Sequence, residues 1–207
     1  MTVDFHTLAQ RIRVPFGFVF AAFFLIFTYP NPTAAVVGFG VALAGLTMRL
    51  WASGCIEKSR RLEVIGPYQY TRNPLYLGSF LLGLGACVAA ANIWLLATFI
   101  VVFWGIYGLV MRREEEEMQK LFPEKFPLYR RSVPLFMPRF RGGKQTSMEP
   151  ETWNPEPETC GTEPDTRHPA PDTRFRWSRA MRNREYNAVL GFVAIFGWIC
   201  FRLTWKG

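Results

Sequence analysis

Two short stretches of the sequence contain residue types that could bind a small charged ligand. The first, "GPYQYTRNPLYLG" at 66–78, combines three tyrosines, an arginine and an asparagine with two glycines and two prolines. The second, "MRREEEEMQKLF" at 111–122, contains four consecutive glutamates. The free amides of a helix N-terminus suit a carboxylate or phosphate, and a glutamate suits an ammonium group or ribose hydroxyls. Each stretch is therefore a candidate for binding part of a small charged ligand.

Proline and glycine in the first stretch predict its backbone. The Gly-Pro pair at 66–67 forces a turn, and Pro74 disfavours helix at Asn73. The chain from 66 to 74 is therefore expected to be extended or turned, with a helix that begins near Pro74. Asn73 is well placed as the N-cap of that helix, so a purely structural role would also account for this residue.

Three further features have a functional and a structural interpretation that the residues alone leave open. Tyr68 and Tyr70 would project from one side of an extended segment, either as a wall for a flat ring or as an aromatic belt at a membrane interface. The glutamates at 114–117 are a solvated helical face unless the helix turns one or two of them back toward a bundle. Arg49, in the inner part of an apolar run, is either functional or snorkels to the interface.

The elements that must position these residues are apolar runs. Half of the 207 residues are apolar, and five runs approach the roughly 20 residues that a membrane-spanning helix needs. These runs are 14–29, 34–52, 75–91, 93–111 and 188–203. Small residues in the second run suit close helix contact, namely Gly38, Gly40, Ala42, Ala44 and Gly45. We predict an all-α, polytopic membrane bundle of about five transmembrane helices with a cofactor pocket on its cytoplasmic face.

The distribution of charge predicts the topology. Cations precede the first run, fill the connector between the second and third, and follow the fourth, whereas the connectors "YPNPT" and "AAAN" are uncharged. The cations are Arg11, Arg13, Lys58, Arg60, Arg61, Arg72, Arg112 and Arg113. This positive-inside pattern places the N-terminus and both stretches in the cytoplasm and the C-terminus outside. It also accounts for the net charge of +8, so with no recognition motif present we expect no nucleic-acid partner.

Composition divides the chain into three parts. Residues 1–140 form the expected membrane core, 141–186 a polar cytoplasmic insert, partly disordered, and 187–207 the fifth transmembrane helix. The insert is acidic and proline-rich at first, and then arginine-rich in "RFRWSRAMRNR". That second half is either an interfacial helix on anionic lipid or a basic flank that only fixes topology. The four cysteines show no CxxC pair or metal-ligand spacing, so we expect neither disulfides nor a metal.

The two stretches resemble the motifs of the isoprenylcysteine carboxyl methyltransferase and phospholipid methyltransferase superfamily of integral membrane enzymes. The first motif matches at Gly66, Pro67, Tyr68, Tyr70, Arg72, Asn73, Pro74, Tyr76 and Gly78. The second matches at Glu114, Glu115, Phe122, Tyr129, Val133 and Pro138. The resemblance extends from about residue 45 to residue 139, and two spaced motifs make it specific.

The resemblance implies a site for S-adenosylmethionine in which 66–78 wrap the adenosine and amino-acid ends and the glutamates complete the pocket. The implied cofactor-binding residues are Gly66, Pro67, Tyr68, Tyr70, Arg72, Asn73, Pro74, Tyr76, Leu77, Gly78, Glu114 and Glu115. Catalytic roles are expected for Arg72, Asn73 and Glu115, and substrate contacts for Arg49 and Trp51. Because a sulfonium methyl donor is intrinsically reactive, the protein mainly positions the nucleophile in line and excludes water.

Three positions depart from the family pattern. Asn73 replaces the usual histidine, Pro123 a glycine and Phe126 a tyrosine. The methyl acceptor stays open: a prenylcysteine carboxylate, a lipid amine or another membrane-soluble molecule, in a protein expected in the bacterial inner membrane. Two other functions are considered. One is an NADPH-dependent reductase, because membrane sterol reductases carry a related Arg-His-Pro-x-Tyr-x-Gly signature. The other is a non-catalytic membrane scaffold. The oligomeric state is not predicted.

Overall fold

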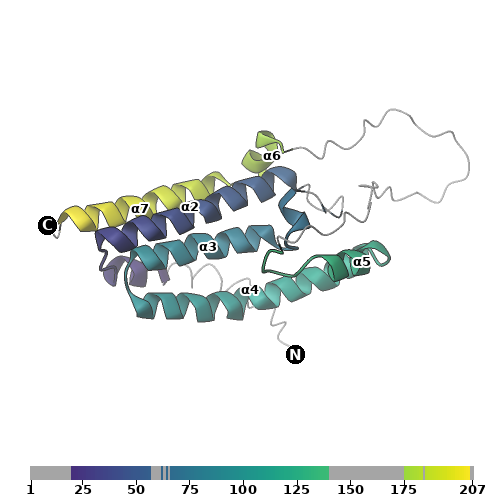
Figure 1. The fold of residues 1–207 in the computed structure, drawn as a ribbon, viewed down its shortest axis with the longest axis horizontal. Helices are drawn as coiled ribbons and strands as arrows, with labels where there is room; N and C mark the ends of the chain where they lie inside the picture. The colour runs from purple at the N-terminus through teal and green to yellow at the C-terminus, as the bar shows by residue number, and fades with distance from the viewer. Residues whose placement is uncertain are drawn as a thin grey trace, which may run out of the picture.

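Every regular element in the part of the chain that the structure describes is a helix (Figure 1). The computed structural model describes residues 20–56, 62, 64, 66–139, 175–183 and 185–205. Helical residues 20–26 come first. The later elements are α2 (Pro32–Cys55), the 3-10 helix η1 (Gly66–Gln69), α3 (Pro74–Ala89), α4 (Ile93–Leu121), α5 (Lys125–Ser132), α6 (Trp177–Arg182) and α7 (Tyr186–Trp205). The predicted all-α class is confirmed for these residues.

Three helices are long and apolar enough to cross a membrane, and they are α2, α4 and α7. The helix α3 is apolar but has only 16 residues, so it is about 24 Å long and shorter than a hydrocarbon core of about 30 Å. The first predicted span, 14–29, lies mostly outside the described residues. The expected set of five spans is therefore confirmed for three, and α3 is the short member of the bundle.

Helix α4 continues well beyond its apolar part. The sequence pattern predicted a span ending near Met111, and the helix runs on without a break to Leu121. At its start, the Asn92 side chain accepts hydrogen bonds from the amides of Trp94 and Leu95, which satisfies donors that the first helical turn leaves free. The glutamates at 114–117 therefore lie on an ordered helix directly after the apolar segment.

Helices α2 and α3 are in backbone contact. A Cβ atom added to Gly85 would lie 2.5 Å from the carbonyl oxygen of Gly38, and one added to Gly45 would lie 2.5 Å from the amide nitrogen of Leu82. Only residues without a side chain, or with a methyl group, allow two helices to approach this closely. Gly38, Gly45 and Gly85 are thus the positions that set the distance between α2 and α3.

The small residues of α2 do not all serve this contact. Gly38, Ala42 and Gly45 are buried against α3, as expected. Gly40 and Ala44 are exposed, and a Cβ atom on Gly40 would meet nothing within 4 Å. The prediction was wrong for these two residues, because they lie on a different face of the helix.

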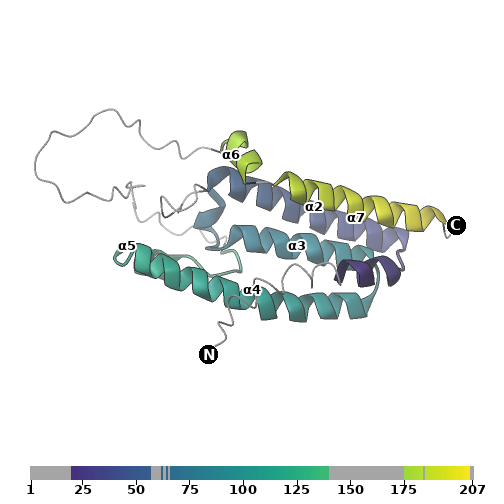
Figure 2. The same ribbon diagram turned by 180° about the vertical axis from the view of Figure 1, so that it is seen from behind.

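The connections gather at two opposite ends of the bundle (Figures 1 and 2). At one end the amide of Tyr29 donates to the carbonyl of Ala90 at 2.9 Å, and the Arg202 guanidinium donates to the carbonyl of Thr28 at 2.8 Å. This end therefore holds both uncharged connectors and the end of α7. The other end holds η1, α5 and α6, and with them both motif stretches. The charge pattern assigns that second end to the cytoplasm, and this sidedness stays a prediction.

Helices α7, α2, α3 and α4 lie side by side in that order in both views (Figures 1 and 2). Aromatic residues Phe192 and Phe196 of α7 pack with Ala42 and Leu46 of α2 in the largest apolar cluster of the described residues. The chain thus returns, after the segment 140–174, to cover the side of α2 that faces away from α4.

Gly85→Ala tests the α2–α3 contact. We expect it to lower the free energy of unfolding by about 1–3 kcal/mol, since the new methyl group meets backbone atoms that can move only with the whole helix. Gly40→Ala is the matched control and should be neutral or stabilising by up to about 1 kcal/mol. Unfolding of the two variants in mixed detergent measures the difference, and equal stability would contradict the packing described here.

Candidate functional site

The first motif stretch is held by a segment that follows it by about sixty residues. The amide of Arg72 donates to the carbonyl of Pro134 at 2.9 Å, and the amide of Arg139 donates to the carbonyl of Tyr70 at 3.1 Å. These two backbone hydrogen bonds place residues 133–139 beside residues 70–73. The turn before α3 is therefore fixed from outside itself, and its side chains have a defined direction.

Side chains add to this connection. Thr71 is fully buried, and its hydroxyl donates to the carbonyl of Phe136 at 3.0 Å. The Asn73 side-chain amide donates to the carbonyl of Leu135 at 3.1 Å. Asn73 does occupy the N-cap position of α3, as expected, but its side chain makes no capping hydrogen bond. The side-chain amide group is oriented by a backbone carbonyl from a distant segment.

An ion pair between Arg72 and Glu115 lies at the centre of the site. The two side chains are only 10% and 16% exposed, and the Arg130 Nε lies 4.0 Å from the Glu115 Oε1. Burial lowers the pKa of the Arg72 guanidinium, the positive charge of Arg130 lowers it further, and Tyr129 acts in the opposite sense. Arginine nevertheless stays protonated in proteins, so a buried positive charge is present beside Glu115.

The Arg72 Nε is buried and has no hydrogen-bond partner among the described residues. An unsatisfied buried donor costs roughly 1–3 kcal/mol, and more for a charged group. Such a donor suits an anionic group of a ligand, which would accept the missing hydrogen bond.

A second contact joins the two motifs one helical turn further along α3. The Tyr76 hydroxyl donates to the Glu114 Oε1 at 2.6 Å, a short bond of the kind that a charged acceptor makes. Glu115 faces the bundle because it lies one turn after the fully buried Met111, whereas Glu116 is exposed. The expected inward turn of one or two glutamates is confirmed, since Glu114 and Glu115 both contact the first motif.

The first motif does not place its tyrosines in an extended strand. Gly66 has a φ of +65° and opens η1, where the expected alternation of side chains no longer applies. The ring of Tyr68 is buried with Ala52 and Cys55, and Tyr70 is only partly buried. That part of the prediction was wrong, because the Gly-Pro turn winds into a 3-10 helix.

Several other motif residues serve packing. Pro67, Pro74, Leu77 and Gly78 are buried, and a Cβ atom on Gly78 would lie 2.6 Å from the Arg49 Cγ. We propose that these residues and Tyr68 position the motif without reaching a ligand. The cofactor-binding residues implied by the resemblance that keep some exposure are Gly66, Tyr70, Arg72, Asn73, Tyr76, Glu114 and Glu115.

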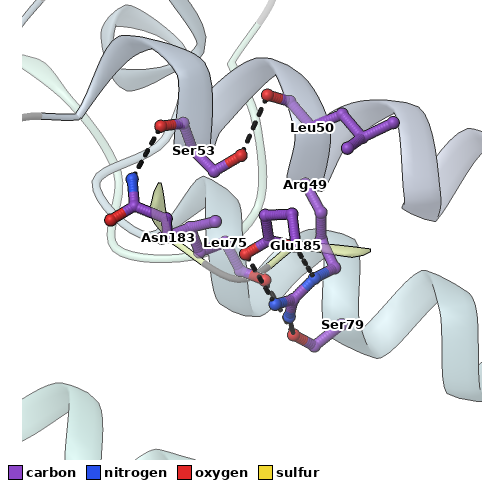
Figure 3. Close-up of polar contacts among 7 residues, drawn as sticks. All are labelled: Arg49, Leu50, Ser53, Leu75, Ser79, Asn183 and Glu185. Atoms are coloured by element: carbon purple, nitrogen blue, oxygen red, sulfur yellow. Dashed lines mark hydrogen bonds and ion pairs between the residues drawn. The ribbon is translucent and has the colours of Figure 1, made fainter. Parts of the chain in front are cut away.

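Arg49 is paired within the protein (Figure 3). Its Nε lies 2.9 Å from the Glu185 Oε2, its second terminal nitrogen donates to the Oε1 at 3.0 Å, and its first donates to the Ser79 hydroxyl. This bidentate pair replaces the snorkelling interpretation. The sequence analysis missed Glu185 because 136 residues separate it from Arg49 and it falls in the segment expected to be a polar insert. Trp51 is exposed on α2, and substrate contact by Arg49 or Trp51 stays a prediction.

Comparison with known proteins finds a match to one protein family over part of the chain. Residues 44–125 match the protein family described as phospholipid methyltransferase. This range contains the first motif, all of α3 and α4, and Glu114 and Glu115. It leaves out the residues 133–139 that hold the first motif and the whole of α6 and α7.

Two curated relatives match in part. The Schizosaccharomyces pombe (strain 972 / ATCC 24843) protein-S-isoprenylcysteine O-methyltransferase is 30% identical over 82 residues, or 40% of this chain and 35% of the relative. The nickel-cobalt-cadmium resistance protein NccN of Alcaligenes xylosoxydans xylosoxydans is 38% identical over 107 residues, or 48% of this chain and 49% of the relative. The chain thus spans half or less of each relative's length. No solved structure matches the chain. Among the described residues, no group of three or more His, Cys, Asp or Glu could hold a metal ion.

Glu185→Gln tests the Arg49 pair. We expect the free energy of unfolding to fall by about 1–3 kcal/mol, less than for a fully buried pair because a quarter of the Arg49 side chain is exposed. Arg49→Gln should cost a similar amount, and the double variant should cost clearly less than the two single changes together. Unfolding titrations of all four proteins measure this coupling, and strictly additive effects would show that the pair contributes nothing.

Proposed function

We propose that the protein belongs to the phospholipid methyltransferase family, whose model matches residues 44–125, and that it is an integral membrane methyltransferase that uses S-adenosylmethionine. The observation that carries the proposal is the buried ion pair of Arg72 and Glu115, with the Tyr76–Glu114 hydrogen bond beside it. Both contacts join the first motif stretch to the second. Arg72 and Tyr76 lie before and within the first turn of α3, and the two glutamates lie toward the end of α4.

The charges of this site fit the proposed cofactor. The amino-acid end of S-adenosylmethionine carries a carboxylate and an ammonium group, and the site offers a guanidinium and carboxylates in return. We propose that Arg72, whose Nε is buried without a described partner, holds the carboxylate. Glu114 and Glu115 would hold the ammonium group or the ribose hydroxyls. Binding of the amino-acid end would replace one internal ion pair by two pairs with the ligand, so this end of the ligand adds no net charge to the site.

The residues of the chain then have positioning roles. When bound, the cofactor supplies an electrophilic methyl group. The hydrogen bonds from residues 70–73 to residues 133–139 keep the site rigid, as a reaction that depends on in-line positioning requires. Asn73 has no titratable group, and its amide is engaged with Leu135, so we propose that it supports the site and transfers no proton.

The acceptor is proposed to be lipophilic. Leu77, Phe103, Met111 and Phe136 form an apolar cluster, and Tyr76 of the site packs against it. An isoprenylcysteine-type carboxylate or a lipid amine could therefore place its polar end at the charged pair and its apolar part among the helices. We propose that this site faces the cytoplasm of a bacterial inner membrane, from which a soluble cofactor can enter.

Calorimetric titration of the detergent-purified protein tests the cofactor. S-adenosylmethionine and its demethylated product should both bind, and NADPH should not. Binding of NADPH alone would identify a reductase, and binding of none of the three would favour a non-catalytic membrane protein.

Glu115→Gln tests the site. We expect cofactor affinity to fall by about 10- to 100-fold, because a charge-assisted hydrogen bond contributes roughly 1.5–3 kcal/mol. Glu116→Gln is the matched control, because the Glu116 side chain is exposed. The cofactor affinity of this variant should not change. The same titration with both variants, together with a thermal unfolding curve for each, separates lost binding from lost folding. Equal affinities would mean that the site lies elsewhere.

A further inference from the structure

The residues of α6 lie on three faces of the helix, and none of them has a role in the proposed methyl transfer. Arg179 and Ala180 are buried. Trp177 and Met181, four residues apart and so on one face, are 59% and 48% exposed. Arg182 is exposed on a third face. The exposed side of this short helix thus carries two apolar side chains beside one arginine, and apolar and cationic side chains lie side by side in this way on helices in a membrane interface.

The orientation of α6 is fixed by the end of α2. The amide of Arg176 donates to the carbonyl of Gly54 at 3.1 Å, and the Asn183 side chain donates to the carbonyl of Ser53 at 2.9 Å (Figure 3). The ring of Phe175 lies against Gly54, where a Cβ atom would clash with it. Since these contacts anchor the buried face, Trp177 and Met181 must point away from the bundle.

The connection to α7 sets the depth of α6 relative to a membrane. Helix α7 has 20 apolar-rich residues, about 30 Å, which matches a hydrocarbon core. Its first residue, Tyr186, is exposed and follows Glu185, which is held by Arg49. Only residues 183–185 separate α6 from α7, so α6 lies within about one turn of the plane where the spanning segment begins. Figures 1 and 2 show α6 at this end of α2 and α7.

We propose that α6 binds the anionic headgroups of the membrane surface. Trp177 and Met181 enter the boundary between headgroups and acyl chains, where aromatic side chains are favoured. Arg182 and the exposed Arg176 contact phosphate oxygens, and each contributes roughly a five-fold preference for anionic lipid. This surface fits a bilayer better than a soluble partner, because the anchor on α2 and α7 holds it at the depth of the headgroups.

Quenching of Trp177 by brominated lipid tests the proposal in the full chain. The protein is reconstituted into nanodiscs that contain phosphatidylcholine and phosphatidylglycerol, with the bromine on one lipid or on the other. Subtracting the signal of Trp177→Phe isolates the contribution of Trp177 from those of the other tryptophans. We expect brominated phosphatidylglycerol to quench Trp177 several-fold more strongly than brominated phosphatidylcholine at low salt, and the difference to shrink at high salt.

The double variant Arg176→Gln, Arg182→Gln should lose most of this preference. The matched control Lys120→Gln, Arg131→Gln removes two exposed cations from α4 and α5 and should keep it. Absence of quenching by either lipid would show that α6 does not reach the membrane, as expected if it binds a soluble partner. Equal quenching by both lipids, or a preference that survives the Arg176→Gln, Arg182→Gln change, would also overturn the proposal. The outcome does not depend on the cofactor, so it is independent of the proposed function.

Discussion

The backbone contact between α2 and α3 is the constraint on which the rest of the structure depends. With no side chains between them at Gly38, Gly45 and Gly85, the two helices act as one rigid unit. This unit brings Arg49 of α2 beside Ser79 of α3, and Arg49 in turn holds Glu185 at the start of α7. The same closeness places the end of α2 next to η1, where Tyr68 is buried.

The candidate site lies where α4 and residues 133–139 meet the α2–α3 unit. Helix α4 supplies the glutamates because it continues past its apolar part, and residues 133–139 return from α5 to occupy the other side of the first motif. The buried charges at the site are supported on three sides by α3, α4 and this returning segment. A buried ion pair is costly when its atoms lack hydrogen bonds. The Arg72 Nε has no hydrogen-bond partner among the described residues, whereas the Arg49 Nε and one of its terminal nitrogens both donate to Glu185.

The sequence predicted those features that depend on local pattern. Runs of apolar residues located α2, α4 and α7, and a helix that continues past Met111 was enough to predict that one or two of the glutamates at 114–117 would turn toward the bundle. Features that depend on distant partners were missed. Nothing local distinguishes Thr71 as a buried residue, because its partners lie some 65 positions away.

Distant contacts also decide how two residues of the first motif lie. Asn73 occupies the N-cap position of α3, as the sequence predicts, but its side-chain amide donates to the carbonyl of Leu135 and makes no capping hydrogen bond. The segment expected to align Tyr68 with Tyr70 is a 3-10 helix, in which the ring of Tyr68 packs against Ala52 and Cys55. Single-sequence patterns cannot register such distant partners.

The hydrogen bonds from residues 70–73 to residues 133–139 also bear on how the protein is made. During synthesis the first motif leaves the ribosome well before the segment that holds it, with all of α4 and α5 still to follow. Local helices form within microseconds, whereas contacts between such distant segments form late. Helices α2, α3 and α4 can therefore form first, and the contacts that hold the first motif are completed only when the chain has reached about residue 139. Helix α7 follows later still, so the candidate site can be assembled before the last apolar helix has been made.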